Sequence, residues 1–438
     1  MKKFTSLLLT AVLLTAMLSV FAIPASAEGE EVKKSENATW FENSKDPVWW
    51  ELTENGTVLP DGKTGRTLTI GGKGEMPRYT VTPKSDDRPW KDYIETITTV
   101  VIDSGVTNIG NHAFNGCTNL TSVTIPSGVT QIGNFAFQNC KSLQSVTIPY
   151  GVTSIGGKAF YDCANLTSVT IPSGVTSIGS SAFQGCASLQ SVTIPSSVTN
   201  IETCAFMNCK SLQSVTIPYG VTSIDGSAFQ GCTSLQSVTI PSSVTRIDGN
   251  AIYSCGKLAS VTVKTSTPPT LGSKVFDRNL RNLAIYVPCG AVENYNEVWS
   301  SYRDQIKEAY IVDDQPGENG KIMLDKDCFP VDNFTEEQTV TISVVPAEGY
   351  QLQADSLTVF YKDGEEEIPV ELTQDETDPT KYSFEMPKAN VTLKASFEAI
   401  PDGTGSILSG GSLWIVIAGA VVLVGAVVAV VVVKKKKM

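Results

Sequence analysis

"CKSLQSVTIPYGVTSI", residues 140–155, occurs a second time, letter for letter, at residues 209–224. A spacing of 23 residues also separates successive cysteines in the middle of the chain, which are Cys117, Cys140, Cys163, Cys186, Cys209, Cys232 and Cys255. Isoleucine repeats with the same period from Ile109 to Ile247. A fixed period of this size is the sequence signature of a solenoid. We therefore interpret the duplicated stretch as a structural building block and not as a chemical motif that the protein needs twice.

Each repeat contains a short extended segment of the form V-x-I-P. Side chains alternate between the two faces of a strand, so Val123 and Ile125 are predicted to point inward. Ser122 and Thr124 then face outward. Pro126 ends the strand because proline cannot donate to a ladder.

The second half of each repeat is predicted to hold another short strand and a helical turn. Val129 and Ile132 face inward from this strand, and a polar or glycine residue can cap the helical turn that carries Ala136-Phe137. The residue before each cysteine is glycine, asparagine, aspartate or, once, serine. The first three types tolerate a left-handed backbone, as expected where a helical turn ends.

Stacking explains why the repeats are so alike. One repeat cannot bury its apolar side chains alone, but stacked repeats bury them in continuous ladders. The pattern L-x-x-V-x-I-P-x-x-V-T-x-I-G-x-x-A-F-x-x-C resembles the 23-residue leucine-rich repeat of BspA-like bacterial surface proteins over residues 97–263. The resemblance implies a mostly β leucine-rich-repeat solenoid of about eight coils with short helical turns.

The regions beside the repeats resemble other parts of such surface proteins. Residues 65–102 are similar to the amino-terminal cap of the family and residues 285–306 to its carboxy-terminal cap. Residues 346–398 resemble an internalin B-repeat or immunoglobulin-like spacer. The predicted parts are an N-terminal cap region (28–96), the solenoid (97–263), a C-terminal cap (264–310), a small β-sandwich or β-grasp-like module (311–399) and a linker (400–412).

The two ends of the chain predict export and membrane attachment. Residues 1–27 combine early lysines, an apolar stretch and a final Ala-Ser-Ala, which is typical of a secretory signal peptide. Residues 413–433 carry no charge and precede a basic tail at 434–438. This arrangement predicts one transmembrane helix with a cytoplasmic tail and an extracellular ectodomain.

A sorting motif is present in altered form. Residues 400–405 resemble the LPxTG signal of wall-linked proteins, but Gly403 is inserted. The insertion shifts the Thr-Gly bond by about 3.5 Å in an extended peptide. We therefore expect retention in the cell membrane, with attachment to the cell wall as the alternative.

The exported part of the chain is strongly acidic. Once the six lysines of the two ends are taken from the 33 basic residues, 27 remain against 45 acidic ones, which gives a net charge of about −18. Such a surface repels nucleic acid and anionic lipid headgroups. The charge therefore argues against nucleic acid as a partner.

The sequence offers little to a catalytic or metal site. His112 is the one histidine, and its equivalents vary so widely that we expect an exposed, freely variable position. This argues against Ser-His, Cys-His and His-ligated zinc sites. A surface role is predicted for the acidic residues of the repeats, which are Asp162, Glu202, Asp225 and Asp248. No cofactor is implied, and we expect a protein that is not an enzyme.

The cysteine ladder has three interpretations. A metal site is disfavoured because no C-x-x-C spacing is present. Disulfides between positions stacked about 4.8 Å apart are an alternative, although seven is an odd number and parallel side chains pair poorly. We expect buried free thiols that pack as small apolar residues. Cys204 is expected to be exposed, and Cys289 and Cys328 are left unassigned.

The outward strand positions form the candidate binding surface. They are mostly serine, threonine and glutamine and carry almost no charge. Two tyrosines follow the strand proline where other repeats have serine, and aromatic rings can stack on a sugar or anchor a protein. The predicted ligand-binding residues are Tyr150, Tyr219, Gln144, Gln190, Gln213 and Gln236.

These features predict a surface-displayed protein that binds an extracellular protein or glycan and is held in the membrane by its C-terminal helix. Two alternatives remain open. One is a structural envelope component whose repeats contact copies of themselves, which self-association of the ectodomain would reveal. The other is an accessory to glycan-processing enzymes, which a polysaccharide-degradation screen would detect.

Overall fold

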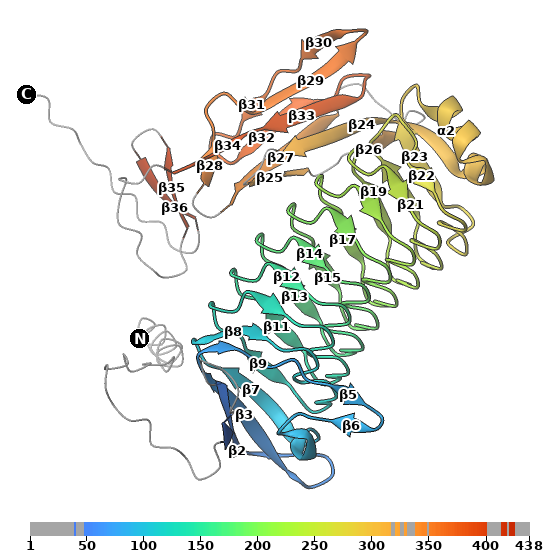
Figure 1. The fold of residues 1–438 in the computed structure, drawn as a ribbon. Coiled ribbons are helices and arrows are strands. Elements are labelled where there is room, and N and C mark those ends of the chain that lie inside the picture. The colour runs from blue at the N-terminus through green and yellow to red at the C-terminus, as the bar shows by residue number, and fades with distance from the viewer. Residues whose placement is uncertain are drawn as a thin grey trace, which may run out of the picture. The chain divides into compact units, whose positions relative to one another are not determined.

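The structure is a computed structural model of the chain (Figure 1). It describes residues 39–40, 48–316, 320–324, 328–330, 338–347, 350–400, 413–417 and 420–424. The predicted signal peptide (1–27) and basic tail (434–438) lie outside these residues, as does the linker (400–412) apart from Ile400.

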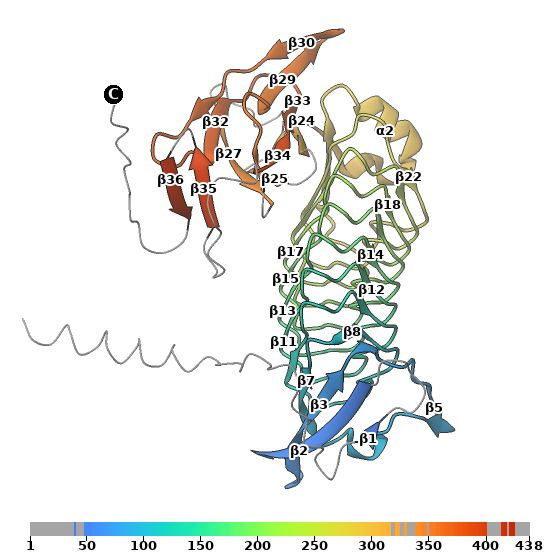
Figure 2. The ribbon, with the colours of Figure 1, turned by 60° about the vertical axis from the view of Figure 1, so that its left-hand side comes forward.

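Each coil of the solenoid contributes two short strands, and the two sets run along different sides of the stack (Figure 2). The first-strand side consists of β7 (Ile97–Ile102), β9 (Ser122–Thr124), β11 (Ser145–Thr147), β13 (Ser168–Thr170), β15 (Ser191–Thr193), β17 (Ser214–Thr216), β19 (Ser237–Ile240), β21 (Ser260–Val263) and β23 (Ala284–Pro288). The second-strand side consists of β8 (Val106–Ile109), β10 (Gln131–Ile132), β12 (Ser154–Ile155), β14 (Ser177–Ile178), β16 (Asn200–Ile201), β18 (Ser223–Ile224), β20 (Arg246–Ile247) and β22 (Thr270–Leu271). The paired strands are parallel and one repeat apart in register, so that Val146 lies opposite Val169.

The solenoid has about nine coils, one more than predicted. Strand β23 pairs in parallel with β21, and Ser260 lies opposite Ala284, a spacing of 24 residues. Asn279 stands where the other coils have cysteine, and its side-chain oxygen accepts the Cys255 N–H at 2.7 Å. The sequence pattern misses this coil because both its spacing and its cysteine position differ from the repeat.

The predicted inward and outward positions of the strands are confirmed, although Val123 and Ile125 themselves are half-buried against the core. Val146 and Ile148 are at most 5% exposed, whereas Ser145 and Thr147 are exposed. The apolar positions of successive coils join into one buried cluster. Within it, ring centroids are 5.2–5.5 Å apart along a stack formed by Phe114, Phe137, Phe160, Phe183, Phe206 and Phe229.

The predicted helical turn is wrong, because this segment forms a third side of each coil. We call it the turn side; in the first coil it covers residues 110–117. The Ala113 N–H donates to Gly110 O within its own coil, whereas the Phe114 N–H donates to Ala136 O in the next coil. Along the turn side, N–H groups that bond within the coil therefore alternate with N–H groups that bond to the next coil. A continuous helix would direct all of them within one coil.

Two positions on each turn side have a left-handed backbone. The residue before each cysteine has a positive φ in all seven repeats, between 56° at Asp162 and 79° at Gly116, as predicted. The second position is that of His112, whose φ is 57°. The prediction that this position is exposed is wrong: His112 is half-buried, and Ser181 in the same row is buried. Lys158 is exposed, but most of the row is partly covered because its side chains stack between coils, with the rings of His112 and Phe135 4.5 Å apart.

The N-terminal cap continues the first-strand side with longer strands. Strand β2 (Val48–Val58) pairs antiparallel with β1 (Thr39–Trp40) and with β3 (Thr64–Gly72), and β3 pairs in parallel with β7. Strand β4 (Gly74–Glu75) extends the second-strand side by pairing with β8. The remaining elements of this cap are β5 (Val81–Thr82), β6 (Ser85–Asp86) and the 3-10 helix η1 (Lys91–Tyr93).

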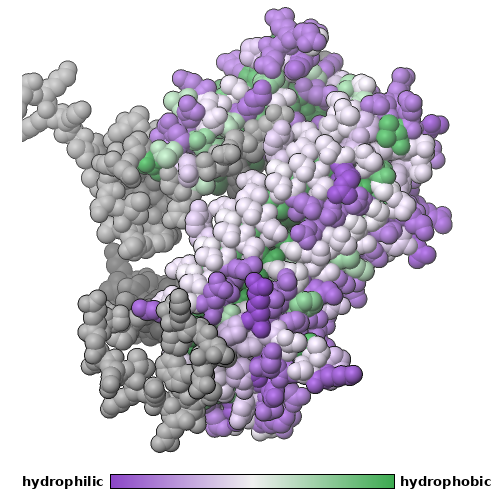
Figure 3. All heavy atoms as spheres, viewed as in Figure 1, coloured by the Kyte–Doolittle hydropathy of each residue, from purple (hydrophilic) through white to green (hydrophobic). Residues whose placement is uncertain are grey.

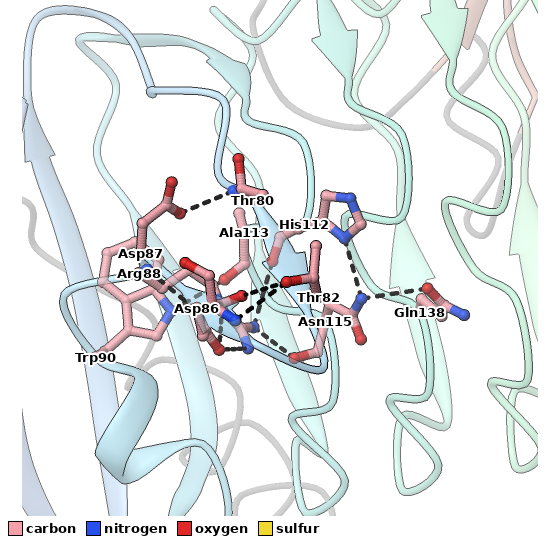
Figure 4. A network of polar contacts seen from close by, with 11 residues as sticks. Thr80, Thr82, Asp86, Asp87, Arg88, Trp90, His112, Ala113, Asn115 and Gln138 are labelled. Carbon is pink, nitrogen blue, oxygen red and sulfur yellow. Dashed lines mark hydrogen bonds and ion pairs between the residues drawn. The ribbon is translucent and has the colours of Figure 1, made fainter.

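Three donors of this cap close the turn side of the first coil, and Figure 4 shows two of them, Arg88 and Trp90. In later coils the equivalent carbonyls accept N–H groups from the preceding coil. Here the donors and acceptors are Tyr79 N–H to Asn111 O (3.1 Å), Trp90 Nε1–H to Ala113 O (2.9 Å) and Arg88 Nη1–H to Asn115 O (2.5 Å). Arg88 is 2% exposed and forms an ion pair with Asp86. The cap thus supplies the donors that a preceding coil supplies elsewhere in the stack.

The C-terminal cap consists of α2 (Val292–Val298), the 3-10 helix η2 (Ser300–Gln305) and the first part of β24 (Ile306–Pro316). The Tyr302 hydroxyl accepts the Phe276 N–H at 3.2 Å and donates to Asp277 Oδ1 at 2.9 Å. In earlier coils the N–H equivalent to that of Phe276 donates to the next coil. This cap therefore provides an acceptor where the stack ends.

The described residues of the module that follows form strands and no helix, as predicted, and its two main sheets include one that continues the first-strand side of the solenoid through β23 and β24. One contains β24, β33 (Val391–Ala395), β29 (Thr358–Asp363) and β30 (Glu366–Pro369). The other contains β25 (Gly320–Leu324), β27 (Thr339–Pro346), β32 (Lys381–Glu385) and β31 (Thr373–Gln374). Strand β26 (Cys328–Pro330) pairs with β24, and β28 (Tyr350–Leu352) pairs with β34 (Phe397–Ala399). One buried cluster joins the two sheets and includes Val359, Leu393, Ile342 and Phe384.

A transmembrane helix was predicted over residues 413–433, and none is found in the part of the chain that the structure describes. None of the described helices is long and apolar enough to cross a bilayer. Within that span the structure describes β35 (Leu413–Ile417) and β36 (Ala420–Val424), which pair antiparallel, and the other residues of the span lie outside the description. Valine and isoleucine dominate this span, and their branched side chains favour strands as well as apolar surroundings.

Candidate functional site

The first-strand side presents rows of small polar side chains. Ser145 lies opposite Ser168, which lies opposite Ser191, and the threonines two residues later stack in the same way. Neighbouring side chains in such a row are about 4.8 Å apart. The solenoid surface visible in Figure 3 is largely pale, which means that it is neither strongly hydrophilic nor hydrophobic.

The four predicted glutamines stand in one row of this side, and all are exposed. The Gln213 N–H donates to Gln190 O at 3.0 Å, and the Gln236 N–H donates to Gln213 O at 3.2 Å, so these three belong to consecutive coils. Thr167 separates Gln144 from Gln190, and its N–H donates to Gln144 O at 2.9 Å. The structure therefore brings the four residues into one line, with one interruption.

The two predicted tyrosines lie at the corner where the first strand ends. Tyr150 is 68% exposed and Tyr219 is 36% exposed. Ser173 and Ser196 occupy the same corner in the two coils between them. A separation of three coils corresponds to about 14 Å, so the two rings do not touch each other. A partner that contacts both tyrosines must extend along the stack.

The seven ladder cysteines are free and fully buried, as predicted. From Cys140 onward, each Sγ–H donates to a phenylalanine carbonyl of the preceding coil at 3.2–3.3 Å. Burial raises the pKa of Cys117, Cys209 and Cys255 to about 12, and it raises the pKa of Cys140 well above the usual range. Thiols that stay protonated are poor nucleophiles and metal ligands. The ladder therefore has a structural role.

Cysteines outside the ladder were expected to be exposed or were left unassigned. Cys204 is half-buried rather than exposed, because it stands in the stacked row of His112. Cys289 is also a half-buried free thiol, and its pKa is raised by burial and by Glu308. The side chain of Cys328 lies outside the description.

The acidic residues of adjacent coils form surface ion pairs. Arg246 Nη2 lies 2.9 Å from Asp225 Oδ1, and Arg246 Nη1 binds Asp248. Asn200 Nδ2 also donates to Asp225, at 3.1 Å. Across the described residues, no group of three or more histidine, cysteine, aspartate or glutamate side chains could hold a metal ion.

Sequence reasoning missed a hollow on the second-strand side. It has a volume of about 110 Å³ and is lined by Arg78, Asn108, Ile109, Gly110, Asn111, Gln131, Gly133 and Asn134. The signal that could have found it is the pair Asn111 and Asn134, one period apart. Arg78 comes from the cap and belongs to no repeat, so no period points to it.

Comparisons with known families divide the chain into two matched parts. Residues 92–213 and 200–296 match the family described as "BspA type Leucine rich repeat region", with six copies of the repeat. Residues 310–401 match the "Divergent InlB B-repeat domain". Neither is a catalytic family. No match was found among curated proteins.

Solved structures that are similar to this chain include three leucine-rich-repeat proteins. The leucine rich repeat protein TpLRR of T. pallidum is 31% identical over 42% of this chain and 87% of its own, with a TM-score of 0.32. A leucine-rich repeat protein from Bacteroides ovatus is 24% identical over 59% of this chain and 74% of its own, with a TM-score of 0.40. A leucine rich cell surface protein from Faecalibacterium prausnitzii is 22% identical over 59% of this chain and 97% of its own, with a TM-score of 0.29.

The family assignment rests on sequence and not on these TM-scores, which are all below 0.5. The repeat period of 23 residues agrees with the six matched copies of the repeat. The repeat region of the chain, residues 92–296, belongs to the BspA-type leucine-rich-repeat family, and it is followed by a divergent InlB B-repeat domain at residues 310–401.

Proposed function

We propose that this chain is a non-catalytic protein of the bacterial surface that binds an extracellular protein or glycan through the first-strand side of its solenoid. The observation that carries the proposal is the exposure of Tyr150, 68%, beside rows of uncharged side chains. Truncating an aromatic anchor costs about 2 kcal/mol or more where binding desolvates it fully. Tyr150 and Tyr219 are the proposed anchors.

The glutamine row supports the same surface. Gln190, Gln213 and Gln236 are exposed on consecutive coils, so their carboxamides offer donors and acceptors at a repeat of about 4.8 Å. Repeat solenoids bind along extended surfaces because neighbouring coils present equivalent positions in rows. Gln144 belongs to the same coil as Tyr150 and precedes the strand that leads to it.

The test compares the full-length protein with the double variant Tyr150→Ser and Tyr219→Ser, which restores the serine found in other coils. Both proteins are used to capture partners from cell-surface and matrix extracts, and captured molecules are quantified by mass spectrometry. Capture of specific partners should fall at least tenfold in the double variant. The control, Ser173→Ala, changes the same corner without removing an aromatic ring and should capture normally. If the double variant is folded and captures the same partners equally well, the site is not on this row.

Export and membrane retention are part of the same proposal. They are supported by the signal-peptide pattern of residues 1–27 and by the uncharged span 413–433 before the lysine tail. Protease added to intact cells should remove residues 28–400, and detergent alone should extract the full-length chain. Protection of the repeats from protease contradicts surface display, and release only by wall-digesting enzymes contradicts membrane retention.

A further inference from the structure

A second surface, on the second-strand side of the first coils, has the chemistry of an anion-binding site. It is the hollow of about 110 Å³ described above, and we call it the asparagine hollow. At roughly 30 Å³ per water molecule, it has the volume of three to four waters. This is enough room for one carboxylate or a similar small charged group. It lies on a different row from the tyrosines and is independent of the proposed function.

The orientation of the three asparagine side chains is fixed by backbone donors. The side-chain oxygen of each accepts a backbone N–H: Asn108 from Met76 at 2.6 Å, Asn111 from Asn134 at 2.9 Å and Asn134 from Gly157 at 2.7 Å. A backbone N–H can only donate, so the atom that it meets must be the carboxamide oxygen. Because each side-chain oxygen already accepts a backbone N–H, the NH2 group of each asparagine is the group that can donate a hydrogen bond to a ligand. The hollow is therefore rich in donors.

Arg78 adds a positive charge at the edge of the hollow. It is exposed, and no described acidic side chain forms an ion pair with it. Guanidinium groups bind carboxylates through charge-assisted hydrogen bonds, which are stronger than neutral ones. A cation beside three amide donors attracts an anion even on an acidic protein, because the local partners decide the interaction at short range.

A second hollow continues from the first along the stack. It has a volume of about 390 Å³ and shares Gln131 and Asn134 with the asparagine hollow. Its other polar side chains are Ser154, Ser177, Ser180 and Glu202, and Gly156, Gly157 and Gly179 also line it. Hydroxyls, carboxamides and one carboxylate suit a ligand that carries many hydroxyl groups. Protein partners instead favour aromatic anchors in desolvated pockets, and neither hollow has an aromatic residue in its lining.

We infer that these two hollows bind an acidic saccharide. Its carboxylate occupies the asparagine hollow against Arg78, and its hydroxyl-bearing rings lie along the second hollow toward Glu202. A carboxylate fits better than a phosphate monoester, because one guanidinium matches one negative charge and would leave the second charge of the phosphate unpaired.

The test uses the full-length protein and a tetrasaccharide of alternating glucuronate and N-acetylglucosamine, with affinity measured by calorimetry at low ionic strength. Arg78→Gln should weaken binding at least tenfold. The matched control is Arg281→Gln, which removes the same charge from an exposed arginine outside both hollows and should change affinity less than twofold. The same saccharide with its carboxyl groups reduced to alcohols should bind the wild-type protein at least tenfold more weakly.

A second variant tests the neighbouring hollow without changing charge. Gly157→Thr places a side chain in its lining, and Thr203 already occupies the equivalent position two coils later. A Cβ at Gly157 would meet no atom closer than 3.4 Å, so the variant should fold normally and bind the tetrasaccharide at least fivefold more weakly. The inference is overturned if the wild-type protein does not bind the tetrasaccharide, if Arg78→Gln binds it as well as the wild type, or if the two arginine variants lose affinity equally.

Discussion

At the first coil of the solenoid, the backbone groups of the turn side that lack a neighbouring coil are carbonyls, whereas at the last coil they are N–H groups. The N-terminal cap supplies hydrogen-bond donors for these carbonyls, namely the Trp90 indole N–H and the Arg88 guanidinium. The C-terminal cap supplies a hydrogen-bond acceptor, the Tyr302 hydroxyl, which accepts the Phe276 N–H. The difference arises because, on the turn side, every coil in between donates alternate N–H groups to the next coil along the stack.

This comparison explains why the two caps cannot be interchanged. A parallel stack has a direction, so one end always presents acceptors on this side and the other always presents donors. Buried backbone groups left without partners cost free energy, and a cap must supply the complementary group. Arginine and tryptophan side chains offer only donors in these positions, while a tyrosine hydroxyl can accept and donate together.

Alkaline pH should produce the largest effect, because it acts on the whole ladder between the two caps. Burial raises the pKa of all seven thiols above the ordinary 9.0, to about 12 for Cys117, Cys209 and Cys255. A raised pKa in the folded state gives stability that is complete below pH 9 and is lost as the pH rises toward 12. Each thiol should remove about 1.4 kcal/mol per pH unit in this window.

With seven thiols, the loss by pH 10 approaches the whole stability of a typical domain, about 5–15 kcal/mol. Circular dichroism between pH 7 and 11, with a reductant present, should show cooperative unfolding of the solenoid above pH 9. An unchanged spectrum at pH 11 would contradict the buried-thiol ladder. A variant with Cys204→Ala serves as control and should unfold at nearly the same pH, since that thiol is half-buried.

Arg88→Met should be the most damaging single change at either cap. It leaves Asp86 without its cation and the Asn115 carbonyl without its donor, and breaking such a pair costs about 3–5 kcal/mol when it is well buried. The value should fall near the lower end because Asp86 is 23% exposed. Urea unfolding of the full chain measures the change, and the exposed Arg281→Met should stay within about 0.5 kcal/mol of the wild type.

Trp90→Phe and Tyr302→Phe remove one hydrogen-bonding group from each cap while keeping an aromatic ring. Each should lower the free energy of unfolding by about 1–3 kcal/mol, the cost of an unsatisfied buried group. Hydrogen exchange separates the two ends. Tyr302→Phe frees the Phe276 N–H, so this amide should exchange faster, whereas Trp90→Phe frees a carbonyl and exposes no amide proton. If the Trp90→Phe variant instead showed faster exchange of the Ala113 amide proton alone, the proposed difference between the two caps would be wrong.

The smallest expected effect is the difference between a ladder thiol inside the stack and the ladder thiol of the first coil. Cys186 Sγ–H donates to Phe160 O in the preceding coil at 3.2 Å, while Cys117 belongs to the first coil and has no repeat before it. Both are 0% exposed. Cys186→Ala should therefore destabilise the protein by about 0.5–1.5 kcal/mol more than Cys117→Ala, which is the contribution of one hydrogen bond. Equal losses in urea unfolding would show that the Sγ–H bond adds nothing.

The interior of the solenoid was predictable because neighbouring coils place the same types of side chain at the same inward positions. Val123 and Ile125 were predicted to be inward from the alternation of one strand, and the stack buries their equivalents in the next coil, Val146 and Ile148, against similar residues of the neighbouring coils. The left-handed position before each cysteine was predictable in the same way, from the residue types that tolerate it. The tyrosines and glutamines of the candidate binding surface were predicted to form rows for the same reason, but their role in binding stays a prediction.

The turn side and the caps were not predictable from the repeat. A short segment such as Ala136-Phe137 fits a helical turn locally, and only the presence of the next coil redirects alternate N–H groups to it. The same stacking covers the row of His112, which looks freely variable in the sequence. Arg88 and Arg78 stand in the cap without periodic equivalents, so nothing in their own segments shows which carbonyls or asparagines they approach.

The sequence by itself determined the period, the strands, the inward residues and the family of this protein, because these depend on side-chain patterns that recur every 23 residues. Only the tertiary structure decided where the hydrogen bonds of the turn side go, how each end of the stack is closed and where the asparagine hollow lies. These features join groups from different coils or from a cap and a coil, as when the Asn134 N–H donates to Asn111. Such contacts depend on the direction of the stack, which no single repeat contains.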